Sequence, residues 1–133
     1  MEFIKAVVQF NQEVLGIEQR SPGPLSAKEL DLSVKCLTEE LEEFCDASRK
    51  MDYIGQIDAI VDSMYFSIGV LYKLGLTPEQ IHACCMAVHS ANISKKRGVN
   101  AKRATGAADA IKPEGWVGPE ERIKAILGMQ IFS

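Results

Sequence analysis

Apolar side chains recur every three or four residues along most of this chain, which is the spacing of helices that bury one face. Nowhere does the sequence alternate apolar and polar residues as a half-buried strand does. The stretch Gly98–Gly118 is rich in glycine and alanine and predicts an irregular C-terminal tail. The spacing predicts four long helices and a short fifth, over Met1 to about Leu15, Ser26 to about Lys50, about Asp52 to Leu74, Thr77 to about Lys95, and Pro119 to about Leu127. The expected fold is therefore all-α, a four-helix bundle-like core in a single domain over residues 1–133.

Capping residues mark several helix ends. Ser26 to Glu29 and Thr77 to Gln80 have the pattern of capping boxes, in which the first and fourth residues satisfy each other's backbone amides. Gly75 follows the third helix as a C-terminal cap residue. The second helix is expected to bury one stripe, made of Leu30, Val34, Leu37, Leu41, Phe44 and Ser48.

The third helix is apolar on nearly every side. Its largest apolar face consists of Ile57, Ile60, Val61, Met64, Ile68 and Leu71, and the opposite face carries Ala59, Phe66 and Val70. A domain this small has few helices with which to cover both faces. We therefore expect a homodimer, or a higher homo-oligomer, that buries the second face through its helices.

Composition and charge narrow the possible functions. The chain is 47% apolar and 25% charged, which is typical of globular proteins, and its net charge of −3 provides no basic surface for nucleic acid. The four cysteines form no CxxC pair and no signal peptide begins the chain, so we expect reduced thiols in a cytoplasmic protein. The charge-free stretches Ser63–Tyr72 and Gln80–Ser94 are too short to cross a membrane.

Carboxylates on the second and third helices are expected to meet. Asp58 and Asp62 lie one turn apart on an apolar helix, where buried carboxylates are costly unless they are paired or bind a metal. A tight antiparallel turn near Lys50 would place Glu43 opposite Asp58, and Glu39 opposite Asp62. Glu40 falls within one residue of the Asp62 level and, with Glu43, lies nearer the apolar stripe than Glu39, so Glu40 and Glu43 rank first as ligands.

Four converging carboxylates of this kind, Glu40, Glu43, Asp58 and Asp62, suit a hard cation, Mg²⁺ first and Mn²⁺ second. The alternative is an exposed acidic face whose aspartates are capped by hydroxyl groups. A di-iron bundle is excluded, because it needs two Glu-x-x-His repeats and only Glu79 to His82 fits.

Four segments, taken in order, resemble the MazG-like all-α nucleoside triphosphate pyrophosphohydrolases, a superfamily that includes phosphoribosyl-ATP pyrophosphohydrolase and the dimeric dUTPases. The segments are Glu39-Glu40-Leu41-Glu42-Glu43-Phe44, Asp58-Ala59-Ile60-Val61-Asp62, His89 to Lys95, and Lys112 to Pro119 with Trp116. The resemblance extends from about Phe10 to Ile126. One departure is Ala59, which stands where the family carries an acid, so that Asp58 becomes the acidic partner of Asp62.

The resemblance implies hydrolysis of an NTP or dNTP to the monophosphate and pyrophosphate, for nucleotide-pool cleaning or remodelling. Mg²⁺ held by the four carboxylates would neutralise the phosphates and activate water, with Glu39 or Glu40 as catalytic residues. The expected substrate-binding residues are Asn92, Lys95, Lys112 and Trp116, with Phe10 and Asn11 as further candidates for the nucleotide pocket. Two alternatives remain: a non-catalytic helical interaction module, and the same fold acting on phosphoribosyl-ATP or an alarmone.

Overall fold

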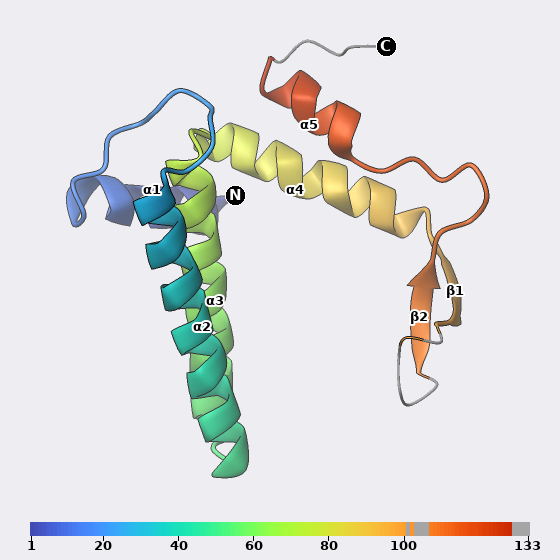
Figure 1. Ribbon diagram of the computed structural model, residues 1–133, viewed down its shortest axis with the longest axis horizontal. Coiled ribbons are helices and arrows are strands. Elements are labelled where there is room, and N and C mark those ends of the chain that lie inside the picture. The colour runs from blue at the N-terminus through green and yellow to red at the C-terminus, as the bar shows by residue number, and fades with distance from the viewer. Residues whose placement is uncertain (101, 103–106, 129–133) are drawn as a thin grey trace. The chain divides into compact units, whose positions relative to one another are not determined.

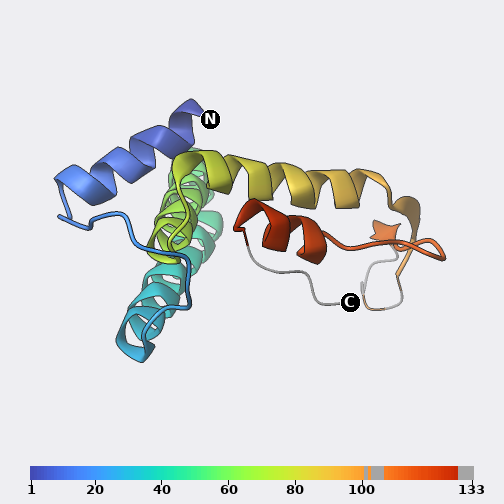
Figure 2. The ribbon, with the colours of Figure 1, turned by 90° about the horizontal axis from the view of Figure 1, so that it is seen from above.

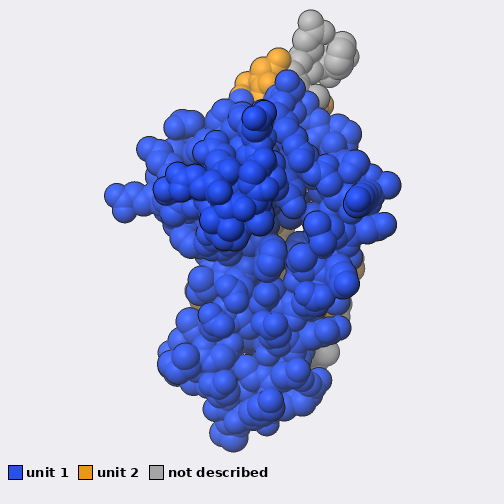
Figure 3. Space-filling model, turned by 90° about the vertical axis from the view of Figure 1, so that its left-hand side faces the viewer, with its two compact units in different colours: residues 1–81 blue, residues 82–133 orange. Residues whose placement is uncertain are grey.

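The computed structural model describes residues 1–100, 102 and 107–128. In these residues the chain forms five helices and one short hairpin (Figure 1), in the order α1 (Glu2–Glu13), α2 (Ala27–Arg49), α3 (Tyr53–Lys73), α4 (Pro78–Ile93), β1 (Lys96–Val99), β2 (Ala108–Ile111) and α5 (Glu120–Ile126). The chain divides into two compact units, residues 1–81 and 82–133, which Figure 3 colours separately. The mostly helical fold predicted from the sequence is confirmed.

The predicted caps form. Ser26 Oγ accepts a hydrogen bond from the Glu29 amide at 3.2 Å, and Thr77 and Gln80 each accept the other's backbone N–H. Gly75 ends α3 with a φ of 95°, and a Cβ there would collide with the Ser21 carbonyl, so this position requires glycine.

In the first unit, α2 and α3 run side by side as an antiparallel pair (Figures 1 and 2). The turn between them is tight, because the Asp52 amide donates back to the Ala47 carbonyl at 2.8 Å and the Asp52 side chain caps α3 at Gly55. Helix α1 packs on α3, where Phe3 and Phe10 contact the ring of Tyr65 edge-on at centroid distances of 5.9 and 5.4 Å. This packing covers the half of α3 that is distant from the turn.

The buried face of α2 differs from the predicted stripe. Leu30, Val34 and Leu41 are 52%, 55% and 61% exposed, whereas Ser33, Glu40 and Ala47 are buried. Small residues on this face let α3 approach closely, and the Ser33 hydroxyl is satisfied by donating to the Glu29 carbonyl at 2.8 Å. The predicted stripe was wrong for these three leucine and valine residues, because α2 turns Glu40 rather than Leu41 toward its neighbour, whereas its other members, Leu37, Phe44 and Ser48, are half-buried.

Helix α3 buries Ala59, Gly69 and Tyr72 and leaves its larger apolar face open. The exposed fractions of Ile57, Ile60, Val61 and Met64 lie between 43% and 52%. By length and composition alone this helix would suffice to cross a membrane, a test that core helices of soluble proteins also pass. In this chain the helix pairs along its length with α2 and carries two aspartates, Asp58 and Asp62.

Within residues 1–100, 102 and 107–128, the second unit holds the only strands. Strands β1 and β2 pair antiparallel, with Lys96 opposite Ile111 and Val99 opposite Ala108. A Cβ at Gly98 would collide with the Ile111 side chain, so glycine permits the close approach. The prediction that Gly98–Gly118 is irregular was therefore wrong for these four-residue strands, which are too short and too exposed to show apolar alternation.

Candidate active site

Three acidic side chains from the two antiparallel helices converge. Glu40 and Glu43 extend from α2 and Asp62 from α3, and one carboxylate oxygen of each lies within 4.8 Å of the others. Glu40 and Glu43 lie on one face because they are three residues apart, and the tight turn brings the Asp62 level of α3 opposite them. The sequence placed these three residues together, and the structure does the same.

Glu40 is the buried member of this group. It is 9% exposed, and its Oε2 atom has no hydrogen-bond partner in the described part of the chain. Burial, followed by the neighbouring charges of Glu43, Asp62 and Asp58, raises the pKa of Glu40 from 4.5 to about 7. A buried carboxylate beside two others is costly unless a proton or a cation neutralises it.

This arrangement fits a divalent cation. Carboxylate oxygens are hard ligands of the kind that Mg²⁺ and Mn²⁺ prefer. A cation bound here would neutralise the crowded negative charges and would be coordinated by Glu40 Oε2, which otherwise has no partner among the described residues. Among the described residues no lysine or arginine forms an ion pair with the three carboxylates.

Asp58 and Glu39 lie outside the converging group. Asp58 is exposed, although its charge still contributes to the raised pKa of Glu40, and Glu39 is exposed as well. The expectation that both aspartates are buried was wrong, because Asp62 is half-buried and Asp58 is open to solvent. Helix α1 covers α3 only on the side of Asp62 away from the turn, around Tyr65 and Gly69, and so leaves Asp58 uncovered.

A cavity of about 530 Å³ adjoins the carboxylates within the first unit. Its walls are aromatic and aliphatic, with few polar groups, and α1, α2 and α3 all contribute. The lining residues are Phe10, Asn11, Leu15, Leu32, Ser33, Cys36, Glu40, Asp62, Tyr65, Phe66, Gly69, Val70 and Lys73. Its volume lies in the ordinary range for small-molecule sites, and Glu40 and Asp62 form its acidic end.

The family model of phosphoribosyl-ATP pyrophosphohydrolase matches residues 7–92. The chain belongs to this family. The matched segment contains the three converging carboxylates and every residue that lines the cavity. No curated protein matches the chain. The resemblance to the MazG-like all-α pyrophosphohydrolases is thereby confirmed, and with it a hydrolase family that acts on acid anhydrides and in general depends on a divalent metal.

The remaining predicted site residues lie in the second unit, and Lys95, Lys112 and Trp116 lie beyond the matched segment. The ammonium groups of Lys95 and Lys112 each lie 5.0 Å from the centroid of the Trp116 ring. Trp116 Nε1 donates to the Ala91 carbonyl at 2.8 Å, which ties the tail to α4. Asn92 is exposed. Trp116 therefore anchors the tail and supports both lysines.

Sequence reasoning missed several residues of the cavity, in particular Lys73, Tyr65 and Phe66. These residues follow Asp62 at helical spacing, so the face of α3 that carries the carboxylate also carries them. That spacing was a usable signal. The cavity itself depends on α1 crossing this face, as the contact of Phe10 with Tyr65 requires, and no local pattern encodes that crossing.

Proposed function

We propose that this protein hydrolyses a nucleoside triphosphate or deoxynucleoside triphosphate to the monophosphate and pyrophosphate, with Mg²⁺ as the preferred cation and Mn²⁺ as a substitute. One observation carries the proposal: Glu40 Oε2, a buried oxygen with no partner among the described residues, belongs to a group of three carboxylates, and two of these, Glu40 and Asp62, line a cavity of nucleoside size. Membership in a pyrophosphohydrolase family supports this chemistry.

Glu40, Glu43 and Asp62 would hold the cation, with Asp58 as a fourth ligand from the next turn of α3. When bound, the cation supplies charge neutralisation for the phosphates and lowers the pKa of a water molecule. Glu39, exposed beside the cluster, is proposed as the base that orients the attacking water toward the α-phosphorus. Glu40 would serve both as a ligand and as a catalytic residue, because it lines the cavity as well as belonging to the carboxylate group.

The cavity would hold the nucleoside. Phe10, Tyr65 and Phe66 offer aromatic surface against which a base can stack, and Tyr65 is held in place by Phe3 and Phe10. In the second unit, Lys95 and Lys112 are proposed to bind phosphate oxygens from their positions on Trp116, and Asn92 to contact the sugar or the base.

Pyrophosphate release from a panel of nucleotides tests the function. We expect turnover with Mg²⁺ or Mn²⁺, none in excess chelator, and none for Asp62→Asn. Asp46→Asn is the matched control, because Asp46 is an exposed acid of α2 outside the cluster. Full turnover in chelator would contradict the proposal. Phosphoribosyl-ATP belongs in the panel, since the family carries that name.

We also propose that the protein is a homodimer. The exposed apolar face of α3, with Phe44 and Tyr53, forms a groove of about 400 Å³, and soluble monomers rarely leave large apolar patches open. Size-exclusion chromatography with light scattering should report a dimer for the wild type and a monomer for Ile60→Lys. Val14→Lys, at an exposed residue outside this groove, is the control, and a stable wild-type monomer would contradict the proposal.

A further inference from the structure

The end of the cavity opposite the carboxylates has a different chemistry from the acidic end. Asp62 and Lys73 both line the cavity from α3, eleven residues apart, which is about 16 Å along the helix axis. Among the described residues that line the cavity, Lys73 is the only cationic one. A nucleoside whose phosphates meet the carboxylates would direct its base toward Lys73.

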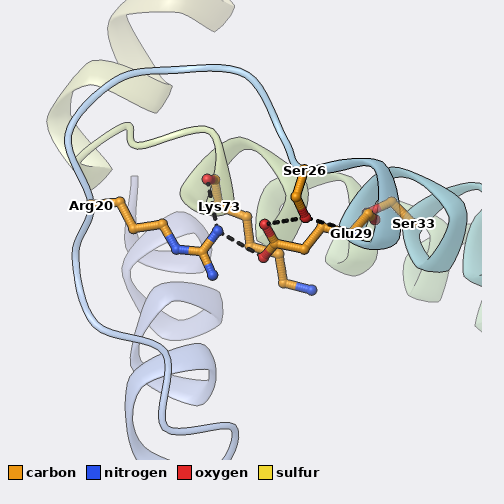
Figure 4. Close-up of polar contacts among 5 residues, drawn as sticks. All are labelled: Arg20, Ser26, Glu29, Ser33 and Lys73. Atoms are coloured by element: carbon orange, nitrogen blue, oxygen red, sulfur yellow. Dashed lines mark hydrogen bonds and ion pairs between the residues drawn. The ribbon is translucent and has the colours of Figure 1, made fainter.

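The ammonium group of Lys73 is free to act on a ligand. Arg20 binds beside the backbone of Lys73: its Nη1 atom is 2.7 Å from Glu29 Oε2 and also donates to the Lys73 carbonyl at 3.4 Å (Figure 4). Glu29 is thus already paired with Arg20. In the described part of the chain, the Lys73 ammonium makes no hydrogen bond or ion pair, and Figure 4 accordingly has no dashed line that reaches it.

Asn11 of α1 adds a hydrogen-bond acceptor beside Gly69, which lies one turn before Lys73 on α3. Its Nδ2 atom donates to the Val7 carbonyl at 2.9 Å, so the amide is held with its oxygen turned away from that carbonyl. This side chain lies over Gly69, where a Cβ would be only 3.3 Å from Nδ2 and 3.5 Å from Oδ1. Among the described residues Asn11 Oδ1 accepts no hydrogen bond, although Asn11 is only 3% exposed. Ser33 also presents only lone pairs, because its proton goes to the Glu29 carbonyl.

A fixed acceptor beside a lysine is complementary to a ring N–H beside a carbonyl oxygen. Uracil, thymine, guanine and hypoxanthine have this edge. Cytosine and adenine reverse this order, with an amino group beside an unprotonated ring nitrogen. In the same position, the amino group would meet the Lys73 ammonium, which can only donate, and the ring nitrogen would meet the Asn11 oxygen, which can only accept. We propose that Lys73, with Asn11, selects nucleotides whose base carries an oxo group over the matching amino bases. This inference rests on the proposed function, since it places the nucleoside in the cavity.

A second phosphate fits this end less well than a base carbonyl does. The Glu29 carboxylate pairs with Arg20 and offsets its positive charge. Arg20, Lys73 and Glu29 together therefore carry a net charge of about +1. The adjoining walls are apolar, including Leu15, Leu32 and Val70. One cation in such surroundings suits one carbonyl oxygen.

Two matched pairs of substrates test the inference: dUTP against dCTP, and ITP against ATP. We expect kcat/KM for pyrophosphate release to favour the oxo member of each pair. Lys73→Met keeps the length of the side chain and removes its charge, and should lower kcat/KM for dUTP by about ten- to a hundredfold while leaving dCTP within about threefold. Lys35→Met, an exposed lysine of α2 outside the cavity, should change neither.

Binding of the product monophosphates separates this inference from the proposed function. Isothermal titration should show dUMP binding more tightly than dCMP to the wild type, and equally to Lys73→Met. If that preference appears without any hydrolysis, base selection stands and the enzymatic proposal fails. If hydrolysis occurs with equal kcat/KM within both pairs, or if Lys73→Met slows all four substrates equally, base selection by Lys73 is overturned. Preferential turnover of phosphoribosyl-ATP that depends on Lys73 would overturn it too, because the lysine would then meet a phosphate.

Discussion

Glu29 and Glu40 lie on the same helix, α2, three turns apart, and their surroundings are opposite. The hydrogen bond from Arg20 lowers the pKa of Glu29, and Ser26 donates to the same carboxylate. Burial and the neighbouring acids raise the pKa of Glu40 to about 7, and one of its oxygens has no partner among the described residues. A glutamate whose charge is compensated within the chain holds the fold together. A glutamate whose charge is left uncompensated identifies where a cation is needed.

Catalysis should separate the two glutamates most strongly. Glu40→Gln should lower kcat/KM by on the order of a thousandfold or more, because it removes the carboxylate proposed both as a metal ligand and as a catalytic group. Glu29→Gln should stay within about threefold of the wild type, since Glu29 lies outside the lining of the cavity. The measurement is pyrophosphate release at saturating Mg²⁺. Equal losses in the two variants would remove the distinction.

The stability of the metal-free protein should depend on pH through Glu40. The pKa of Glu40 is about 7 in the folded chain against an ordinary 4.5, so the folded state holds a proton that the unfolded state has released between these values. The stabilisation is full below about pH 4.5 and is lost as the pH rises through 7. Because Glu40 borders a cavity open to water, screening makes the loss smaller than the ~3 kcal/mol that corresponds to the full pKa shift.

Urea unfolding of wild type and Glu40→Gln in chelator, from pH 5 to pH 8, isolates this contribution. The two free energies of unfolding should be close at pH 5, and the variant should be the more stable at pH 8. A difference that does not change with pH would show that Glu40 titrates normally.

Divalent cations should stabilise only the protein that keeps the cluster. At a Mg²⁺ or Mn²⁺ concentration 100-fold above the dissociation constant, the free energy of unfolding of the wild type should rise by about 2.7 kcal/mol. Glu40→Gln should show little of this gain, whereas Glu29→Gln should show all of it. Thermal unfolding with and without cation measures the difference, with Ca²⁺ as a test of cation size.

The smallest effect is expected for Glu29, whose charge is paired with Arg20. Glu29→Gln removes the ion pair with Arg20, so the melting temperature at pH 7 should fall slightly. Because the pKa of Glu29 is lowered in the folded chain, its stabilisation is present above pH 4.5 and disappears as the pH falls through the lowered pKa. The two melting temperatures should therefore converge in acid, and also at high salt. Divergence in acid would contradict this assignment.

Much of the site could be predicted from local spacing. Glu40 and Glu43 are three residues apart, and a tight turn places Asp62 at their level, so helix periodicity and turn length suffice to bring them together. The same reasoning could not show that Asp58 is exposed, because exposure depends on which other element covers that part of α3. It also could not show that Lys73 faces the same cavity as Asp62, since α1 closes that cavity from outside the helical pair.

The sequence by itself determined the helices and their ends, because capping residues, glycine at a positive φ and apolar spacing act within a few residues of one another. Only the tertiary structure decided which face of α2 is buried, since Leu41 and Ala47 are both apolar and only close packing against α3 selects the smaller side chain. That rotation buries Glu40 instead of exposing it. The unusual chemistry of this carboxylate is thus a consequence of packing between segments that no single helix encodes.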